Sequence, residues 1–445
     1  MNRAFKYVVV GVSSLLVALI LAGSLVGQSR QAAEDPSAPY RHLSVYAEVF
    51  AKIKSDYVEE PDMKNVTLGA INGLLVSIDP FASYLNADQY QQYMKAKELK
   101  RASVGLVLSR KYVYDINVVD AIPGSPADKA GFSTGDMIDS INGIQTRDMP
   151  LAFADLLLEG DPGTTVDVTV LRLRKPDPLT IKLTRTEIKS PPLVARMADD
   201  QTGLVQINEL NAGAADRVAA AVKDLEKRGA RRLVLDLRHN TVGADDEGIA
   251  LANLFLDKGT IATLQGQKFP KQTFEADPSK RIFSGPMVVL TNRGTLGGAE
   301  IAAAALADNQ RAQVVGERTF GDAAVRKILR TEDGGAVLMA VAKYYSPAGK
   351  AIQDTGVVPA YMVNDIEGHP LEEEEIEQPE EPAPQAPRKP GEDPVLKKAL
   401  EVLNGAAPVS AARTSTETAV PSPPVPFPPD AVNGHAADLG KKKLP

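Results

Sequence analysis

Strands and helices alternate along residues 203–345, and this alternation constrains the fold more than any other feature of the sequence. Short apolar runs typical of buried strands are followed by stretches whose apolar residues recur every three or four positions. Such alternation indicates parallel βαβ units with helices covering a central sheet. We expect strands at 204–210, 232–237, 287–291, 313–315, 327–329 and 336–345, and helices at 214–228, 245–256 and 299–307.

Residues 38–102 have a helical pattern. Apolar side chains at helical spacing predict helices over 41–57, 66–78 and 89–99, with Asp88 as the N-cap of the third. We expect this segment to serve in packing or oligomerisation.

Residues 103–188 have a different pattern, in which short β-rich runs are separated by turn signals such as Pro123-Gly124 and Asn142-Gly143. Two short helices are expected at 125–129 and 151–158. This pattern indicates a separate, mostly β domain in front of the α/β core, which we place at 189–365.

The amino terminus contains Val8–Gly27, twenty residues without a charge, preceded by Arg3 and Lys6. At 1.5 Å per residue a helix of this length spans roughly 30 Å, the thickness of a bilayer core. We expect residues 1–30 to be an uncleaved single-pass signal anchor. The basic residues would stay in the cytoplasm, with the bulk of the chain in the periplasm at a bacterial-type inner membrane. A cleaved signal peptide is the alternative, with a small-residue site at Ala22-Gly23-Ser24.

Residues 366–445 differ in composition from the rest. They hold the acidic run Glu372–Glu375, a proline-rich stretch and a long segment without periodicity. We expect a disordered, solvated tail with one short helix at 394–403.

Charge and composition exclude several functions. The net charge is −7 without a long basic run, so nucleic acid is not an expected partner. The chain has no cysteine, which excludes disulfides and a thiolate nucleophile. The spacing of Asp245, Asp246, His239 and Asp322 matches no metal motif, so neither a metal nor another cofactor is expected.

Residues 103–188 resemble a PDZ domain of the kind found in bacterial proteases. The resemblance rests on three segments, 105–108 (Gly-Leu-Val-Leu), 123–131 (Pro-Gly-Ser-Pro-Ala-Asp-Lys-Ala-Gly) and 135–143, which begins Gly-Asp-Met-Ile and ends Ile-Asn-Gly. It implies that the strand Gly105, Leu106, Val107 and Leu108 pairs with the C-terminal residues of a bound peptide, with Leu106 and Leu108 flanking the last side chain. The alternative is a domain that serves only as a spacer.

The order of parts from 41 to 361 resembles the C-terminal processing, or tail-specific, serine proteases. Matching segments lie at 79–85, 235–240, 299–301, 307–309, 314–321 and 344–353. The resemblance implies a crotonase- or ClpP-like αβ core, a PDZ domain that regulates access, and cleavage near protein C-termini. It also implies a Ser–Lys catalytic pair, often with a Gln, and no metal.

The expected catalytic residues are all replaced. Alignment on Glu300-Ile301 places the nucleophile at Gly297, and alignment on Phe320-Gly321 places the lysine at Asp322 and the glutamine at Arg326. The glycine-rich turn associated with the oxyanion reads His239-Asn240-Thr241-Val242-Gly243. Pro80 is kept, but Phe81 and Ala82 follow where the family usually has His and Ser.

Two other interpretations of these residues remain open. Thr295, His239 and Asp322 have the side-chain types of a catalytic triad, but Thr295 stands two positions from the expected nucleophile. Alternatively, Gly297-Gly298 forms a tight strand-to-helix turn, and Asp322 is a surface acid or the partner of Arg326.

We therefore expect a membrane-anchored pseudoprotease that binds protein C-termini through its PDZ domain and assembles with itself or with active relatives. The alternative is an active serine-type endopeptidase that uses unconventional residues.

Overall fold

The computed structural model describes residues 38–99, 101–110, 116–147, 149–172, 175–189, 191–364 and 393–405, and those up to Leu403 belong to one compact unit. The predicted signal anchor lies outside the described residues, as does the tail apart from 393–405. None of the helices within the described ranges combines the length and the apolar character needed to cross a membrane.

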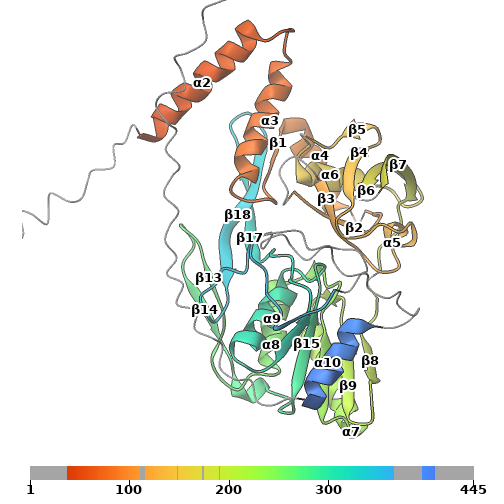
Figure 1. Ribbon diagram of the computed structural model, residues 1–445. Helices are drawn as coiled ribbons and strands as arrows, with labels where there is room; N and C mark the ends of the chain where they lie inside the picture. Colours follow the sequence, from red (N-terminus) through yellow and green to blue (C-terminus); the bar gives the residue numbers. More distant parts are fainter. Residues whose placement is uncertain are drawn as a thin grey trace, which may run out of the picture. The chain divides into compact units, whose positions relative to one another are not determined.

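A six-stranded sheet forms the centre of the core (Figure 1). Its neighbouring strands are parallel, except that β8 runs antiparallel to β9 at one edge. In spatial order the strands are β19 (Tyr361–Met362), β16 (Gln313–Gly316), β15 (Met287–Thr291), β11 (Arg232–Asp236), β9 (Thr202–Gln206) and β8 (Val194–Met197). This confirms the parallel α/β core that the alternation predicts.

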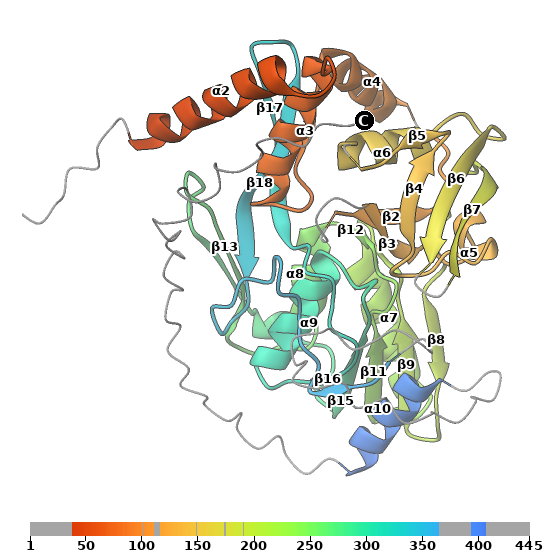
Figure 2. The same cartoon turned by 45° about the horizontal axis from the view of Figure 1, so that its top comes forward.

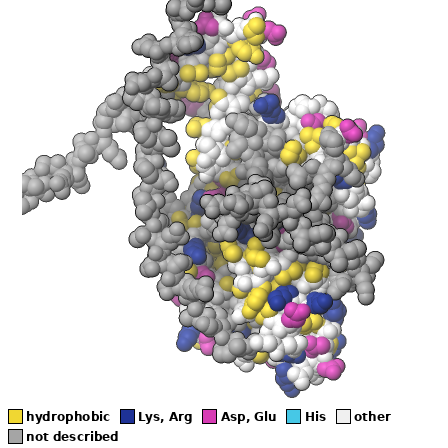
Figure 3. Space-filling model, viewed as in Figure 1, with side chains coloured by type: hydrophobic (Ala, Val, Ile, Leu, Met, Phe, Trp, Pro, Cys, Tyr) yellow, Lys and Arg dark blue, Asp and Glu magenta, His cyan; other side chains and the backbone are white. Residues whose placement is uncertain are grey.

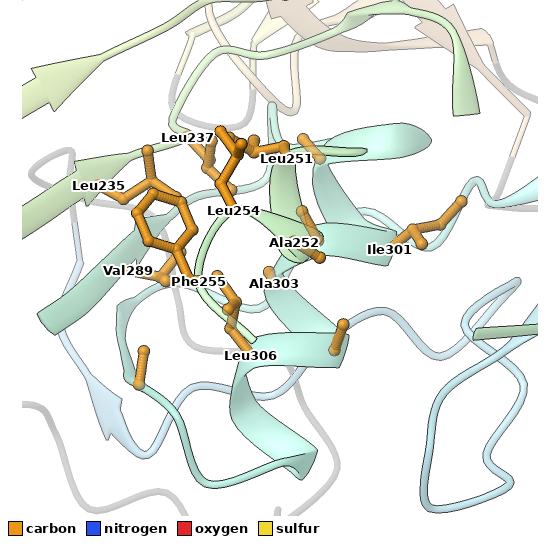
Figure 4. Close-up of a cluster of buried hydrophobic side chains, with 14 of the residues drawn as sticks. Leu235, Leu237, Leu251, Ala252, Leu254, Phe255, Val289, Ile301, Ala303 and Leu306 are labelled. Carbon is orange, nitrogen blue, oxygen red and sulfur yellow. The ribbon is translucent and has the colours of Figure 1, made fainter. Parts of the chain in front are cut away.

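Side chains on alternate positions of these strands build two apolar layers, because successive residues of a strand point to opposite faces. On one face Leu235 and Val289 pack with Phe255 and with α7 (Ala214–Lys227), α8 (Asp245–Asn253) and α9 (Gly298–Asp308). Figure 4 shows Leu235 and Val289 beside the ring of Phe255 in this layer. Figure 2 shows α7, α8 and α9 together on that side.

The opposite face of the sheet is covered by α10 (Pro394–Gly405), which lies within the segment assigned to the tail. Val395 and Ala399 are fully buried against Val234 and Leu290. Asp393 caps the helix and bonds to Arg238, with 2.8 Å between Oδ2 and Nη2. The short helix expected at 394–403 is therefore present, and it belongs to the core rather than to a disordered tail, because the sheet needs a cover on this face.

A second, antiparallel sheet packs against two of the three N-terminal helices. It contains β1 (Ser83–Leu85), β18 (Ala336–Tyr345), β13 (Thr260–Gln265), β14 (Gln272–Glu275) and β17 (Ala324–Arg330). Leu75 of α3 (Met63–Val76) packs on Tyr84 and Val337. The N-terminal helices are α2 (Ala38–Asp56), α3 and α4 (Ala87–Glu98). The cap of α4 is Asn86 in a capping box with Gln89, and not Asp88 as predicted, because the Asn86 side chain reaches the Gln89 N–H.

The PDZ region is a sheet in the order β2-β3-β4-β6-β7 with β5 beside β4. Its elements are β2 (Leu106–Ser109), β3 (Ile116–Ala121), α5 (Pro126–Lys129), β4 (Met137–Ile141), β5 (Ile144–Gln145), α6 (Leu151–Leu158), β6 (Thr165–Arg172) and β7 (Lys175–Thr184). Within the described strands, β2 pairs only with β3, which leaves its other backbone edge open. The short strands β10 (Glu209–Leu210) and β12 (Val242–Gly243) pair with each other in parallel. The short 3-10 helix η1 (Pro278–Lys280) follows β14 in the chain.

Candidate functional site

Gly297 forms the sharp turn between β15 and α9. Its backbone has φ 56° and ψ −121°, a conformation that residues with a side chain rarely adopt. A Cβ added here would lie no closer than 3.7 Å to another atom, so there is space for a side chain. Its N–H already donates to the Asp322 carbonyl at 3.1 Å and to Glu300 Oε2 at 3.2 Å. The tight turn expected at Gly297-Gly298 is present, and it is the kind of strained strand-to-helix elbow on which hydrolases display a nucleophile.

Asp322 and Arg326 form an ion pair beside this turn. Arg326 Nη2 lies 2.5 Å from Asp322 Oδ1, and it is also 3.9 Å from Asp79 Oδ1. The guanidinium carbon of Arg326 lies 4.5 Å from the centre of the Phe81 ring. Phe81 in turn makes an edge contact with Phe320 at 5.4 Å. The partnership of Asp322 with Arg326 is one of the interpretations that the sequence left open.

Desolvation raises the pKa of the carboxyl groups around Gly297. Burial raises the pKa of Asp245 to about 6, and the charge of Asp322 contributes to that rise. Burial also raises the pKa of Asp322, although Arg326 opposes the change. A cavity of about 330 Å³ opens between these groups. Its lining residues are Thr241, Gly243, Ala244, Asp245, Leu296, Gly297, Asp322, Ala324 and Arg326.

The Glu300 carboxylate links the turn at Gly297 to Gly321 and Asp322 through hydrogen bonds. It is fully buried, and Oε1 accepts from Gly321 N at 2.7 Å and from the Thr319 hydroxyl, while Oε2 accepts from Asp322 N at 2.7 Å. Burial raises its pKa to about 7 despite these donors. This role of Glu300 was not predicted, although an acid three residues after a turn glycine is a capping signal.

Thr295 and His239 are engaged elsewhere. The Thr295 hydroxyl is fully buried, donates to Leu237 O at 3.0 Å and accepts from Asn292 N at 3.1 Å. His239 Nδ1 lies 3.0 Å from Asp120 Oδ2, on β3 of the PDZ region. Because Asp322 is paired with Arg326, the three side chains do not assemble into a triad in this geometry.

The contact between His239 and Asp120 links the core to the PDZ region. Asn292 Nδ2 lies 3.1 Å from His239 Nε2 on the other side of the ring. His239 has a positive φ of 56°, a backbone conformation that is uncommon for residues other than glycine. No sequence signal indicates this contact, since the two residues are 119 positions apart.

The PDZ region presents the strand that the sequence predicts as a peptide site. Gly105 has φ 80°, and an added Cβ would lie 2.3 Å from Ser125 Cβ, so only glycine fits. Leu106 and Leu108 are buried in the domain core and also line a cavity of about 560 Å³. Val107 lines it as well, as do Leu151 and Leu158 of α6.

This cavity extends to the site around Gly297. Thr241, Leu296, Asp322 and Arg326 line both the PDZ cavity and the smaller one. The residues of β2 and the Asp322–Arg326 pair therefore line the same cavity. Across the described ranges, no three His, Asp or Glu side chains are placed to hold a metal ion.

The α/β core and the PDZ region are both similar to known proteins. Residues 201–363 match the model of peptidase family S41, and residues 118–172 match a PDZ domain. The carboxy-terminal-processing protease of Bartonella bacilliformis is 29% identical over 91% of this chain and 96% of its own length. The carboxy-terminal processing protease CtpA of Bacillus subtilis is 30% identical over 81% of this chain and 77% of its own length.

A solved structure shows the same fold. The photosystem II D1 C-terminal processing protease superposes with a TM-score of 0.59 at 27% identity, covering 72% of this chain and 92% of that protein. A PDZ domain in front of an α/β peptidase core therefore defines the class of this protein. The chain belongs to the family of carboxy-terminal processing proteases, within peptidase family S41.

Proposed function

We propose that this chain is a catalytically inactive member of its family, a pseudoprotease that binds protein C-termini through its PDZ domain. The observation that carries the proposal is the Asp322–Arg326 ion pair beside Gly297. A serine protease of this kind needs a hydroxyl and a neutral amine that accepts its proton. Glycine supplies no hydroxyl, and a carboxylate bonded to a guanidinium is a poor base.

The arrangement of donors around the turn supports the same conclusion. An oxyanion is stabilised by N–H groups that are free to point at it. The Gly297 N–H instead donates to Asp322 O and Glu300, and the Leu296 N–H donates to Asn240 O at 3.0 Å. Two donors next to the former nucleophile position are thus already committed.

The open edge of β2 and the adjoining cavity support peptide binding. A chain that adds to β2 would satisfy backbone groups which no other described strand pairs, and its last side chain would reach Leu106 and Leu108. Binding without cleavage would hold a protein C-terminus beside the inactive centre. The pseudoprotease would then shield that terminus or compete for it with active relatives.

Two assays on the full chain in mild detergent test the proposal. In the first, an unfolded protein with an apolar C-terminus is incubated with the chain and with an active relative, and only the relative should cleave it. Cleavage by the chain itself, lost on Thr295→Val or Asp322→Asn, would establish the alternative of an active endopeptidase with unconventional residues.

The second assay measures fluorescence anisotropy of a labelled apolar peptide. The free carboxylate form should bind, and the amidated form or the Gly105→Val variant should not. Because the amidated peptide needs no mutation, it separates loss of recognition from loss of folding.

We further propose that residues 8–27 anchor the chain in a bacterial-type inner membrane, with the remainder in the periplasm. The uncharged length of that run and the preceding Arg3 and Lys6 support this. A C-terminal alkaline phosphatase fusion should be active in cells, and the chain should resist carbonate extraction. An inactive fusion or a soluble chain would contradict the anchor.

We also propose that the chain assembles with itself or with active relatives. Tyr46 and Val49 of α2 are about half exposed, at 47% and 50%, on a helix whose apolar stripe also includes Leu43. Figure 3 shows hydrophobic side chains exposed over the N-terminal helices. Tyr46→Glu with Val49→Glu should reduce the assembly to a monomer in light scattering, whereas an unchanged mass would contradict a role for α2.

A further inference from the structure

Asp120 of the PDZ region lies in a socket of the core, which we define as His239, Asn292 and Gly294. The Asp120 carboxylate is buried, and both of its oxygens lie within 3.1 Å of His239 Nδ1. The Gly294 backbone is also in close contact, since an added Cβ there would lie 2.4 Å from Asp120 Oδ2. A side chain at 294 would therefore displace the carboxylate.

Hydrogen bonds fix the His239 ring within the socket. Asn292 Oδ1 accepts from the backbone N–H of His239 at 3.1 Å and from that of Gly294 at 3.0 Å. The amide nitrogen of Asn292 must then face His239 Nε2, which lies 3.1 Å away and accepts its hydrogen. The ring proton stays on Nδ1 and is donated to Asp120. A shift of either loop of the socket would break this set of bonds.

The socket is built on the ends of two central strands that α10 covers. The chain runs from β11 into His239 and from β15 into Asn292. On the face of the sheet that α10 covers, Val395 is fully buried in one apolar cluster with Val234 of β11 and Leu290 of β15. The docked helix therefore supports both of the strands that carry the socket.

An ion pair also joins α10 to the residue before His239. Arg238 Nη2 lies 2.8 Å from Asp393 Oδ2 at the start of α10, and 2.8 Å from Asp236 Oδ2 at the end of β11. Residues 365–392 separate α10 from β19, a length of chain that lets α10 leave the sheet without pulling on β19. Docked and undocked α10 are thus two states of one connected chain.

On the PDZ side, Asp120 lies one strand away from the proposed peptide site. It pairs across the sheet with Val107 of β2, and the ladder shifts register between Val107 and Leu108. A bound C-terminus would join the other edge of β2. A strand that is already held in place loses less conformational freedom when a peptide binds to it, so holding Asp120 should favour binding.

We propose that docking of α10 and binding of a C-terminus to β2 reinforce each other through Asp120 and its socket. The docked helix steadies the ends of β11 and β15, the socket holds Asp120, and β3 then holds β2 in the conformation that receives the peptide. This inference rests on the proposed binding of C-termini and adds a form of regulation to it. A condition that lifts α10 from the sheet weakens the hold on the peptide, and a bound peptide holds α10 more tightly.

Amide hydrogen exchange of the unmodified full chain in mild detergent tests this coupling without a mutation. A saturating apolar peptide with a free carboxylate should slow exchange in residues 395–403 about fivefold, at the low end of couplings between distinct sites. The amidated peptide, which should not bind, is the control and should leave this exchange unchanged.

Variants of α10 test the reverse direction by fluorescence anisotropy of the same peptide. Val395→Asp places a charge in a fully buried contact, so it should undock α10 and weaken binding about fivefold. Asp393→Asn is a milder change that removes the charge facing Arg238, and it should weaken binding in the same direction by less. Glu401→Gln is the matched control, because Glu401 is an exposed acid of α10 that pairs with Lys398, and it should leave the affinity unchanged.

Asp120→Ala separates coupling from a general loosening of the chain. This variant removes the side chain that the socket holds, so its own affinity for the peptide should fall. Adding Val395→Asp to it should cause little further loss, and the peptide should no longer slow exchange in residues 395–403. Independent structural effects of the two changes would instead add.

The outcomes distinguish the two levels of the proposal. A peptide that binds without slowing exchange in α10, or losses that add in the double variant, would overturn the inference and leave C-terminal binding intact. Failure of the carboxylate peptide to bind the unmodified chain would remove the proposed function and this inference with it.

Discussion

Arg326 Nη2 lies 2.5 Å from Asp322 Oδ1, and its guanidinium stacks on Phe81. Three departures from the family pattern thus contact one another. The pair takes up the positions expected for the lysine and the glutamine, and Phe81 takes that of a histidine. These contacts explain how the fold accommodates the three departures, because an aspartate at 322 without Arg326 would be buried with no partner for its charge.

Removing Arg326 should destabilise the core. In Arg326→Gln, Asp322 loses its ion partner in a largely desolvated place, and the free energy of unfolding should fall by about 1–3 kcal/mol. The double variant Asp322→Asn with Arg326→Gln should recover most of this loss, since both charges are gone. Urea denaturation of the two single variants and the double variant measures the coupling, and strictly additive effects would contradict it.

The strained elbow should accept a serine. Gly297→Ser has space for its side chain but must adopt φ 56°, so we expect a fold that is retained and weakened by about 1–3 kcal/mol. Neither the original chain nor this single variant should react with a fluorophosphonate probe. The triple variant Gly297→Ser, Asp322→Lys and Arg326→Gln should be labelled at the introduced serine, as mass spectrometry of the modified peptide would show. Labelling of the original chain at Thr295 would instead favour a rebuilt nucleophile.

Glu300 should make the stability of the core depend on pH. Burial raises its pKa from 4.5 to about 7, so the folded state holds a proton more tightly than the unfolded state does. Its contribution is therefore full below about pH 4.5, declines as the pH rises, and levels off above about pH 7. Glu300→Gln should lose this component of the pH dependence.

The same variant should also be less stable overall, by about 1–3 kcal/mol, because an amide nitrogen would face N–H donors. Urea midpoints at pH 5, 6, 7 and 8 for the chain and the variant give the comparison. A stability difference between the two proteins that stays constant over this range would contradict the assignment.

Asp120 and His239 should hold the PDZ region against the core. In Asp120→Asn the charge that faces the imidazole is lost, and amide hydrogen exchange should quicken about tenfold in residues 116–121 and 239–242. Asp139→Asn, on the neighbouring strand β4, removes an acid of the same domain without touching His239 and should leave both segments unchanged. Equal exchange in Asp120→Asn and in the unmodified chain would show that the contact contributes little.

Much of this fold is predictable from local sequence. The periodicity that predicts β15, α9 and α7 depends on which residues are apolar, and each element buries its own stripe or face. The hairpin of β13 and β14 was not predicted, since its strands gain stability from β18, 70 or more positions later in the chain. The packing of α10 could not be predicted from local pattern either, because the apolar face that it covers is built mostly from strands more than a hundred residues earlier.

The sequence by itself determined that Gly297, Asp322 and Arg326 stand where a serine, a lysine and a glutamine are expected, because neighbouring residues such as Glu300-Ile301 and Phe320-Gly321 fix the alignment. Only the tertiary structure decided what these residues do. It pairs Asp322 with Arg326, commits the Gly297 N–H to neighbours, and turns His239 toward Asp120 rather than toward Thr295. The reason is physical, since hydrogen bonds and ion pairs depend on distances of a few ångströms between segments whose separation along the chain carries no such information.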